Sequence, residues 1–199
     1  SRRRHTKFRN VTGVQTCALP IYDWYADLAA GLGRTPARIA VDTSDEPLRI
    51  LVDRLAPGTA PHLLKPNAEE LASLTGHAGA DLEDDPAVAA RAARELLDRG
   101  VDAVLVTLGG AGAVLATAAG TWHASTPPTT VVSTVGAGDS SLFGYLLGDL
   151  RQQPTAHRLA LAVAYGSAAA GLPGTTIPLP TQVHPELVTV RGLSNTLGG

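Results

Sequence analysis

The chain has 199 residues, of which 44% are hydrophobic and 17% charged, and its formal net charge is −2. This composition is typical of a globular domain with a hydrophobic core, and no apolar run reaches the length of a membrane-spanning helix. The one cysteine, Cys17, excludes an internal disulfide and a cysteine-rich metal site, and it fits a reducing compartment, so we expect a cytoplasmic protein.

Basic residues are concentrated at the start of the chain. Five of the 16 lysines and arginines lie in the first ten positions, and the remainder carries 11 basic against 18 acidic residues, a balance that would repel nucleic acid. Residues 1–21 have no helical or strand periodicity, and residues 11–21 look like a translated sequencing adapter. We therefore expect a non-native leader here; a basic arm or an Arg-rich transit peptide is the alternative.

Regular patterns begin at Tyr22. Helical periodicity and end signals predict helices over 23–32, 47–56, 68–75, 86–99, 139–150 and 155–171. Apolar runs predict strands over 39–41, 62–64 and 103–107, and a hairpin of 113–117 with 121–124 at the sheet edge. Strands that alternate with helices indicate an α/β domain with a mostly parallel sheet over 22–190, followed by a frayed tail over 191–199.

The most informative segment is 131–139, in which a β-branched run is followed by Gly136, Ala137, Gly138 and Asp139. Small residues let backbone N–H groups approach an anion, and a helix that begins at this turn favours a phosphate. A carboxylate in such a place repels the ligand unless it has its own task, such as taking a proton from an attacking hydroxyl. The structural alternative is that Asp139 caps the helix.

A second motif, Lys65–Leu71, follows the predicted strand that ends at Leu64. Asn67 and Glu70 have the spacing of a helix capping box, which would be a purely structural role. Lys65 favours a binding role, because the chain has 14 arginines and only two lysines, and the other lysine lies in the leader. A compact ammonium at a strand end suits a phosphate oxygen.

Two further segments are rich in small residues. Residues 107–112 hold three glycines, more than a simple turn needs, and residues 163–170 form a small-residue helix face suited to close packing. Ligands of α/β sheets bind at the carboxyl ends of the strands, where the motifs after Leu64, Val106 and Val132 are expected. A P-loop is excluded because no Gly-Lys-Ser/Thr ending occurs, and a Rossmann redox domain lacks its third glycine, since position 141 is Ser. The six histidines show no metal-ligand spacing.

Segments 65–71, 107–112 and 133–140 resemble, in the same order, the motifs of the pfkB carbohydrate kinases, a ribokinase-like family. The resemblance implies a ribokinase-like fold, with Asp139 as general base and Gly136, Ala137 and Gly138 as the anion hole. It implies nucleotide contacts from Lys65, Thr107, Gly109, Gly112, Gly138 and Ser167. It also implies that Asn67 and Glu70 order Mg²⁺ beside ATP. Phe143 departs from the family, which usually has a small residue there.

Within the family, Ser133 and the 63–67 segment are most similar to members that convert fructose 1-phosphate and ATP to fructose 1,6-bisphosphate and ADP. Kinases of tagatose 6-phosphate or fructose 6-phosphate are the close alternatives, and a non-catalytic nucleotide-binding fragment is the alternative of another class. The family's first strands, its sugar-binding residues and the β lid of its homodimer are not recognisable upstream of Tyr22. We therefore expect a truncated domain that is inactive by itself, with no nucleic-acid or membrane partner.

Overall fold

The structure is a computed structural model that describes residues 22–194. The predicted leader, with Cys17, and the last five residues of the predicted tail lie outside the described residues. The described strands form one sheet, which runs in the order β1-β2-β3-β4-β5-β6. They are β1 (Ala40–Val41), β2 (Leu63–Leu64), β3 (Ala103–Thr107), β4 (Ala113–Thr117), β5 (Gly120–Ser125) and β6 (Thr189–Leu193).

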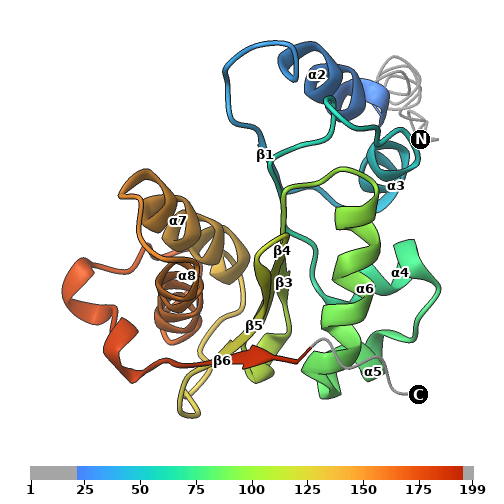
Figure 1. Cartoon of the computed structure of the whole chain (residues 1–199). Helices are drawn as coiled ribbons and strands as arrows, with labels where there is room; N and C mark the ends of the chain where they lie inside the picture. The colour runs from blue at the N-terminus through green and yellow to red at the C-terminus, as the bar shows by residue number, and fades with distance from the viewer. Residues whose placement is uncertain (1–21, 195–199) are drawn as a thin grey trace, which may run out of the picture.

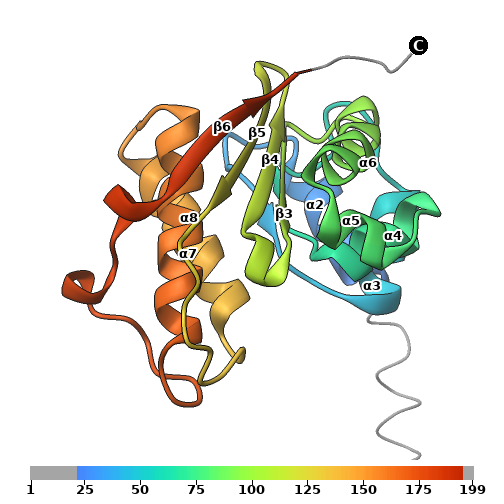
Figure 2. The same cartoon turned by 90° about the horizontal axis from the view of Figure 1, so that it is seen from below.

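Helices cover both faces of this sheet (Figures 1 and 2). One side has α2 (Trp24–Leu32), α3 (Asp45–Asp53), α4 (Ala68–Thr75), α5 (Gly79–Asp84) and α6 (Pro86–Asp98). The other side has α7 (Ala137–Leu150) and α8 (Thr155–Ala170). The predicted α/β class with helices flanking the sheet is confirmed. Within residues 22–194, no helix is long and apolar enough to cross a membrane.

The sheet is mixed, so the prediction of a mostly parallel sheet holds only for its first half. β1, β2 and β3 pair in parallel, whereas β3, β4, β5 and β6 pair antiparallel. Helices connect the parallel strands, but only Ala118 and Ala119 separate β4 from β5. A parallel pair needs a crossover of a dozen or more residues, and so short a connection forces a hairpin.

Three local predictions are corrected. The motif after Val132 does not follow a strand, because the backbone N–H groups of Val132 and Ser133 donate to the Ala170 carbonyl at the end of α8, at 2.8 and 3.2 Å. The frayed tail is wrong for residues 191–193, which belong to β6, where Leu193 pairs with Thr121. The β4–β5 hairpin is not at the sheet edge, because β6 covers β5.

Alternation along the central strands divides the core into two parts. Val104 and Val106 of β3 pack with the cluster under α2 to α6, whereas Ala103 and Leu105 pack with the cluster under α7 and α8. Successive side chains of a strand point to opposite faces. Because β3 is buried on both faces, it appears in the sequence as a continuous apolar run.

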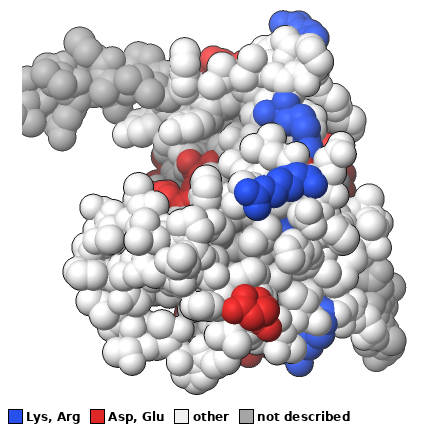
Figure 3. All heavy atoms as spheres, turned by 90° about the vertical axis from the view of Figure 1, so that its left-hand side faces the viewer, with Lys and Arg blue, Asp and Glu red and all other residues white. Residues whose placement is uncertain are grey.

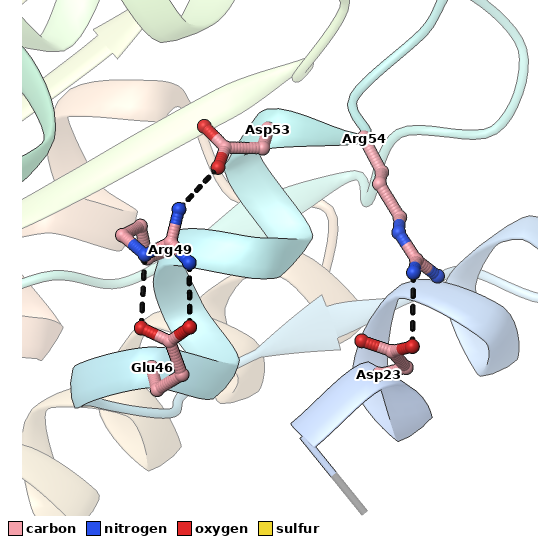
Figure 4. Close-up of polar contacts among 5 residues, drawn as sticks. All are labelled: Asp23, Glu46, Arg49, Asp53 and Arg54. Carbon is pink, nitrogen blue, oxygen red and sulfur yellow. Dashed lines mark hydrogen bonds and ion pairs between the residues drawn. The ribbon is translucent and has the colours of Figure 1, made fainter. Parts of the chain in front are cut away.

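Exposed ion pairs lie within α3 and between the end of α3 and the start of α2 (Figure 4). Within α3, Arg49 contacts Glu46 at 2.5 Å and Asp53 at 2.7 Å, and after the helix Arg54 contacts Asp23 at 2.9 Å. The hydrogen bond from Arg49 lowers the pKa of Glu46. Pairs this exposed contribute little to stability. Of the pairs described, the one between Arg54 and Asp23 joins the end of α3 to the start of α2.

Charged side chains are sparse on the face that α7 and α8 present (Figure 3). Several large apolar residues are exposed on α7 and in the adjoining segments: Val135, Phe143, Leu150, Ile177 and Leu179. The ring of Phe143 makes an edge contact with that of Tyr165, at 5.1 Å between centroids. α7 therefore contributes apolar side chains both to the core and to the surface.

Candidate functional site

A cleft of about 670 Å³ lies where β1, β2 and β3 end. The structure brings together in its lining most of the residues that the sequence singled out: Lys65, Asn67, Glu70, Thr107, Gly109, Gly112, Ala137, Gly138 and Ser167. Gly136 and Asp139 are not part of the lining. Three motifs that are far apart in the sequence thus meet at the sheet edge where α/β proteins bind ligands.

Lys65 is the buried cation of this cleft. It follows β2, its backbone N–H donates to the Val41 carbonyl at 3.1 Å, and only 5% of the residue is exposed. Its Nζ lies 3.0 Å from Oδ2 of Asp42, and a Cβ built on Gly138 would lie 3.3 Å from the same Nζ. The ammonium is therefore directed at the first turn of α7, so that a lysine and a helix N-terminus converge on one point.

The turn before α7 places the glycines and Asp139 differently. Gly136 is the N-cap residue of α7 with φ of 80°, a left-handed conformation that favours glycine. Asp139 lies in the first turn of α7 and is exposed. The alternative in which Asp139 caps the helix is wrong, because Gly136 holds that position. The carboxylate of Asp139 therefore remains available outside the lining of the cleft.

Asn67 and Glu70 form the capping box that their spacing predicts. The backbone N–H of Glu70 donates to Oδ1 of Asn67, and that of Asn67 donates to Oε2 of Glu70, both at 2.8 Å. Asn67 also forms an isolated parallel β-bridge with Thr107, and this backbone pairing joins the motif to the end of β3. The structural role is thus real, and both side chains border the cleft at the same time.

Two of the three glycines of residues 109–112 are required by the local backbone. Gly112 has φ of 95°, and a Cβ there would lie 2.0 Å from the carbonyl oxygen of Ala124. Gly109 has φ of 52°. Gly110 has open space where its Cβ would be. The resulting 3₁₀ turn brings backbone rather than side chains to the cleft, as close approach to a ligand requires.

Ser167 lies on the small-residue face of α8 and also lines the cleft. Its Oγ lies 2.7 Å from Oγ1 of Thr129 and 3.3 Å from Oγ1 of Thr126, and all three residues line the cleft. The neighbouring Gly166 allows close helix packing, since a Cβ there would lie 3.3 Å from the Ala137 carbonyl oxygen.

Sequence reasoning missed several lining residues. Asp42 follows β1 as Lys65 follows β2, so a carboxylate directly after a buried strand was an available signal. Glu83 belongs to α5, a helix that the sequence analysis did not predict, and its carboxylate lies over Gly109. Glu69 and Ser141 also line the cleft.

The donor set fits a divalent cation only if a ligand brings part of its coordination shell. Between residues 22 and 194, no group of three or more His, Cys, Asp or Glu side chains is arranged to hold a metal. Asn67 and Glu70 each use one oxygen in the capping box. Mg²⁺ commonly binds through one or two carboxylates, waters and substrate phosphates, and the cleft is compatible with that arrangement.

Comparison with known proteins shows the family of this chain. The model of the pfkB family of carbohydrate kinases matches residues 37–182. A 1-phosphofructokinase of Rhodobacter capsulatus is 36% identical over 171 residues, which cover 85% of this chain and 51% of that protein. A 1-phosphofructokinase of Bacillus subtilis is 34% identical over 149 residues, 75% of this chain and 46% of that protein.

Solved structures share the fold. The crystal structure of phosphofructokinase-2 from Escherichia coli in complex with substrates and products matches with a TM-score of 0.72 and 27% identity, over 83% of this chain and 52% of that one. The chain spans about half the length of the curated relatives that it matches.

Proposed function

We propose that this chain, which belongs to the pfkB family of carbohydrate kinases, forms the ATP-binding part of a sugar-phosphate kinase. The observation that carries the proposal is the position of Lys65, a buried ammonium aimed at the first turn of α7. Backbone N–H groups at a helix N-terminus and a lysine together favour the phosphates of a nucleotide. The glycine turn at 109–112 and the hydroxyl groups around Ser167 leave room for the rest of the nucleotide in the same cleft.

Different residues would have different roles in the reaction. Lys65 and the turn formed by Gly136, Ala137 and Gly138 would stabilise the transferred phosphoryl group, because negative charge develops on its oxygens. Asp139 would accept the proton of the attacking sugar hydroxyl, for which its exposure beside the cleft is suitable. Asn67 and Glu70 would hold Mg²⁺ on the nucleotide, and the ion would neutralise phosphate charge.

The acceptor we propose is fructose 1-phosphate, because the relatives at 34% and 36% identity are 1-phosphofructokinases. Kinases of fructose 6-phosphate or tagatose 6-phosphate are the alternatives. A non-catalytic nucleotide-binding role is favoured by one observation, namely that Asp139 lies outside the lining of the cleft while the nucleotide residues lie within it.

Titration calorimetry with MgATP and with NAD tests the nucleotide assignment. We expect heat of binding from MgATP and none from NAD. A Lys65→Ala variant should bind MgATP at least about tenfold more weakly, which corresponds to a loss of about 1.4 kcal/mol in binding free energy. Arg94→Ala, a change of a cationic residue on α6 outside the lining, is the matched control. Binding of NAD instead of ATP would contradict the proposal. A coupled assay of ADP release with each sugar phosphate then separates an enzyme from a binding protein.

A further inference from the structure

The cleft is acidic for a site that would bind a phosphorylated ligand. Its lining contains the carboxylates of Asp42, Glu69, Glu70 and Glu83, and Lys65 is the one lysine or arginine among the described lining residues. The ammonium of Lys65 is therefore the group that attracts a phosphate most strongly. The charged groups around this ammonium determine how strongly it attracts the phosphate.

Lys65 already has a counterion. Oδ2 of Asp42 lies 3.0 Å from Nζ, and the exposed fractions of the two side chains are 6% for Lys65 and 27% for Asp42. No other carboxylate of residues 22–194 forms an ion pair with Lys65. A buried ammonium without a partner is costly, and the contact with Asp42 offsets part of that cost.

We propose that Asp42 competes with phosphate for the Lys65 ammonium and thereby lowers the affinity of the cleft for nucleotides that arrive without a metal ion. This inference rests on the proposed function. An ammonium has three N–H donors, and its positive charge is shared among the anions around it. A phosphate oxygen that binds Nζ displaces or weakens the contact with Asp42, which lies at 3.0 Å, and the loss of such a contact reduces binding by about five- to tenfold.

The Asp42→Asn variant isolates the charge, because the amide keeps the size of the side chain and an oxygen that accepts from Nζ. In EDTA, we expect this variant to bind ATP about five- to tenfold more tightly than the wild type in titration calorimetry. Adenosine, which lacks phosphates, should bind equally well to both. Asp102→Asn is the matched control, since it removes the same charge just before β3, at the opposite end of that strand, and should change neither affinity.

A second comparison asks whether Asp42 acts through Lys65. In a Lys65→Met background, the Asp42→Asn change should alter the affinity for metal-free ATP less than about twofold, because the contested ammonium is gone. Thermal melts of each variant verify that it is folded.

The outcomes separate the two proposals. If the wild type binds ATP and Asp42→Asn binds it equally or more weakly, the competition is refuted and the nucleotide site stands. A full gain that persists in the Lys65→Met background also refutes it, because Asp42 then acts only as a distant charge. If neither MgATP nor metal-free ATP binds to the wild type, both proposals are wrong.

Discussion

Lys65 and Asp139 have opposite charges, and the proposed function gives them different tasks. Because Asp139 lies outside the cleft lining, Asp139→Asn should keep the affinity for MgATP within about twofold in calorimetry. In a full-length relative, the same change at the equivalent aspartate should lower turnover by about 100-fold, the usual effect of a lost general base. A loss of ATP affinity as large as that of Lys65→Ala would contradict this division of tasks.

Gly112 tests how strictly the glycine turn constrains side chains. An alanine there would combine φ of 95° with a Cβ 2.0 Å from the Ala124 carbonyl oxygen. We expect Gly112→Ala to lower the free energy of unfolding by about 2 kcal/mol or more in urea denaturation. Gly110→Ala, two residues away and facing open space, should stay within about 0.5 kcal/mol of the wild type. Equal effects at both positions would show that the turn is not constrained as described.

Tyr145 gives the stability a dependence on alkaline pH. Burial and the neighbouring Asp149 raise the pKa of Tyr145 in the fold, so the folded state holds this proton more tightly than the unfolded state. The contribution of the protonated Tyr145 hydroxyl to the free energy of unfolding is complete below the ordinary tyrosine pKa of about 10. It is lost as pH rises above that value. The free energy of unfolding should therefore fall less between pH 9 and 11 in Tyr145→Phe than in the wild type. The exposed Tyr22→Phe should behave as the wild type does.

At the level of elements, α7 and α8 pack closely through glycine. A Cβ on Gly144 of α7 would lie 2.4 Å from the carbonyl oxygen of Leu161 in α8. Gly144→Ala should therefore push the two helices apart and destabilise the protein by about 1 to 3 kcal/mol in thermal melts. In α2, Gly31→Ala meets nothing within 4 Å and should stabilise the helix by about 0.5 to 1 kcal/mol. A neutral Gly144→Ala would show that this contact can relax without cost.

Helices with strong local end signals were predicted most accurately. The capping box of Asn67 and Glu70 marks the start of α4, and Asp85 followed by Pro86 marks that of α6, so both starts agree with the structure. The predicted start of α3 was two residues late, since the helix begins at Asp45. α5 was not predicted because its six residues hold one buried apolar side chain, Leu82, and so show no periodicity.

For the whole molecule, we predict that this chain alone does not phosphorylate fructose 1-phosphate at the ordinary kinase rate of about 1 to 100 per second. Phosphoryl transfer needs the acceptor to be held in line with the γ-phosphate, and positioning is worth about 7 to 11 kcal/mol. Asp139, the proposed base, is exposed in the described part of the chain, so water reaches it. A coupled assay of ADP release checks this, and turnover at an ordinary rate by a pure, folded preparation would show that the chain holds its acceptor.

The sequence by itself determined the α/β class and most helices and strands. It also singled out the segments around Lys65, Gly109 and Gly136 as candidate binding segments. Capping pairs, apolar runs and glycine clusters are local signals, which is why these features could be predicted. Only the tertiary structure decided the mixed sheet, the β6 pairing of residues 191–193, and the ion pair of Asp42 with Lys65. These features join residues that are distant along the chain, or depend on which strands become neighbours. The residue types of one segment do not specify which distant residues will contact that segment in the fold.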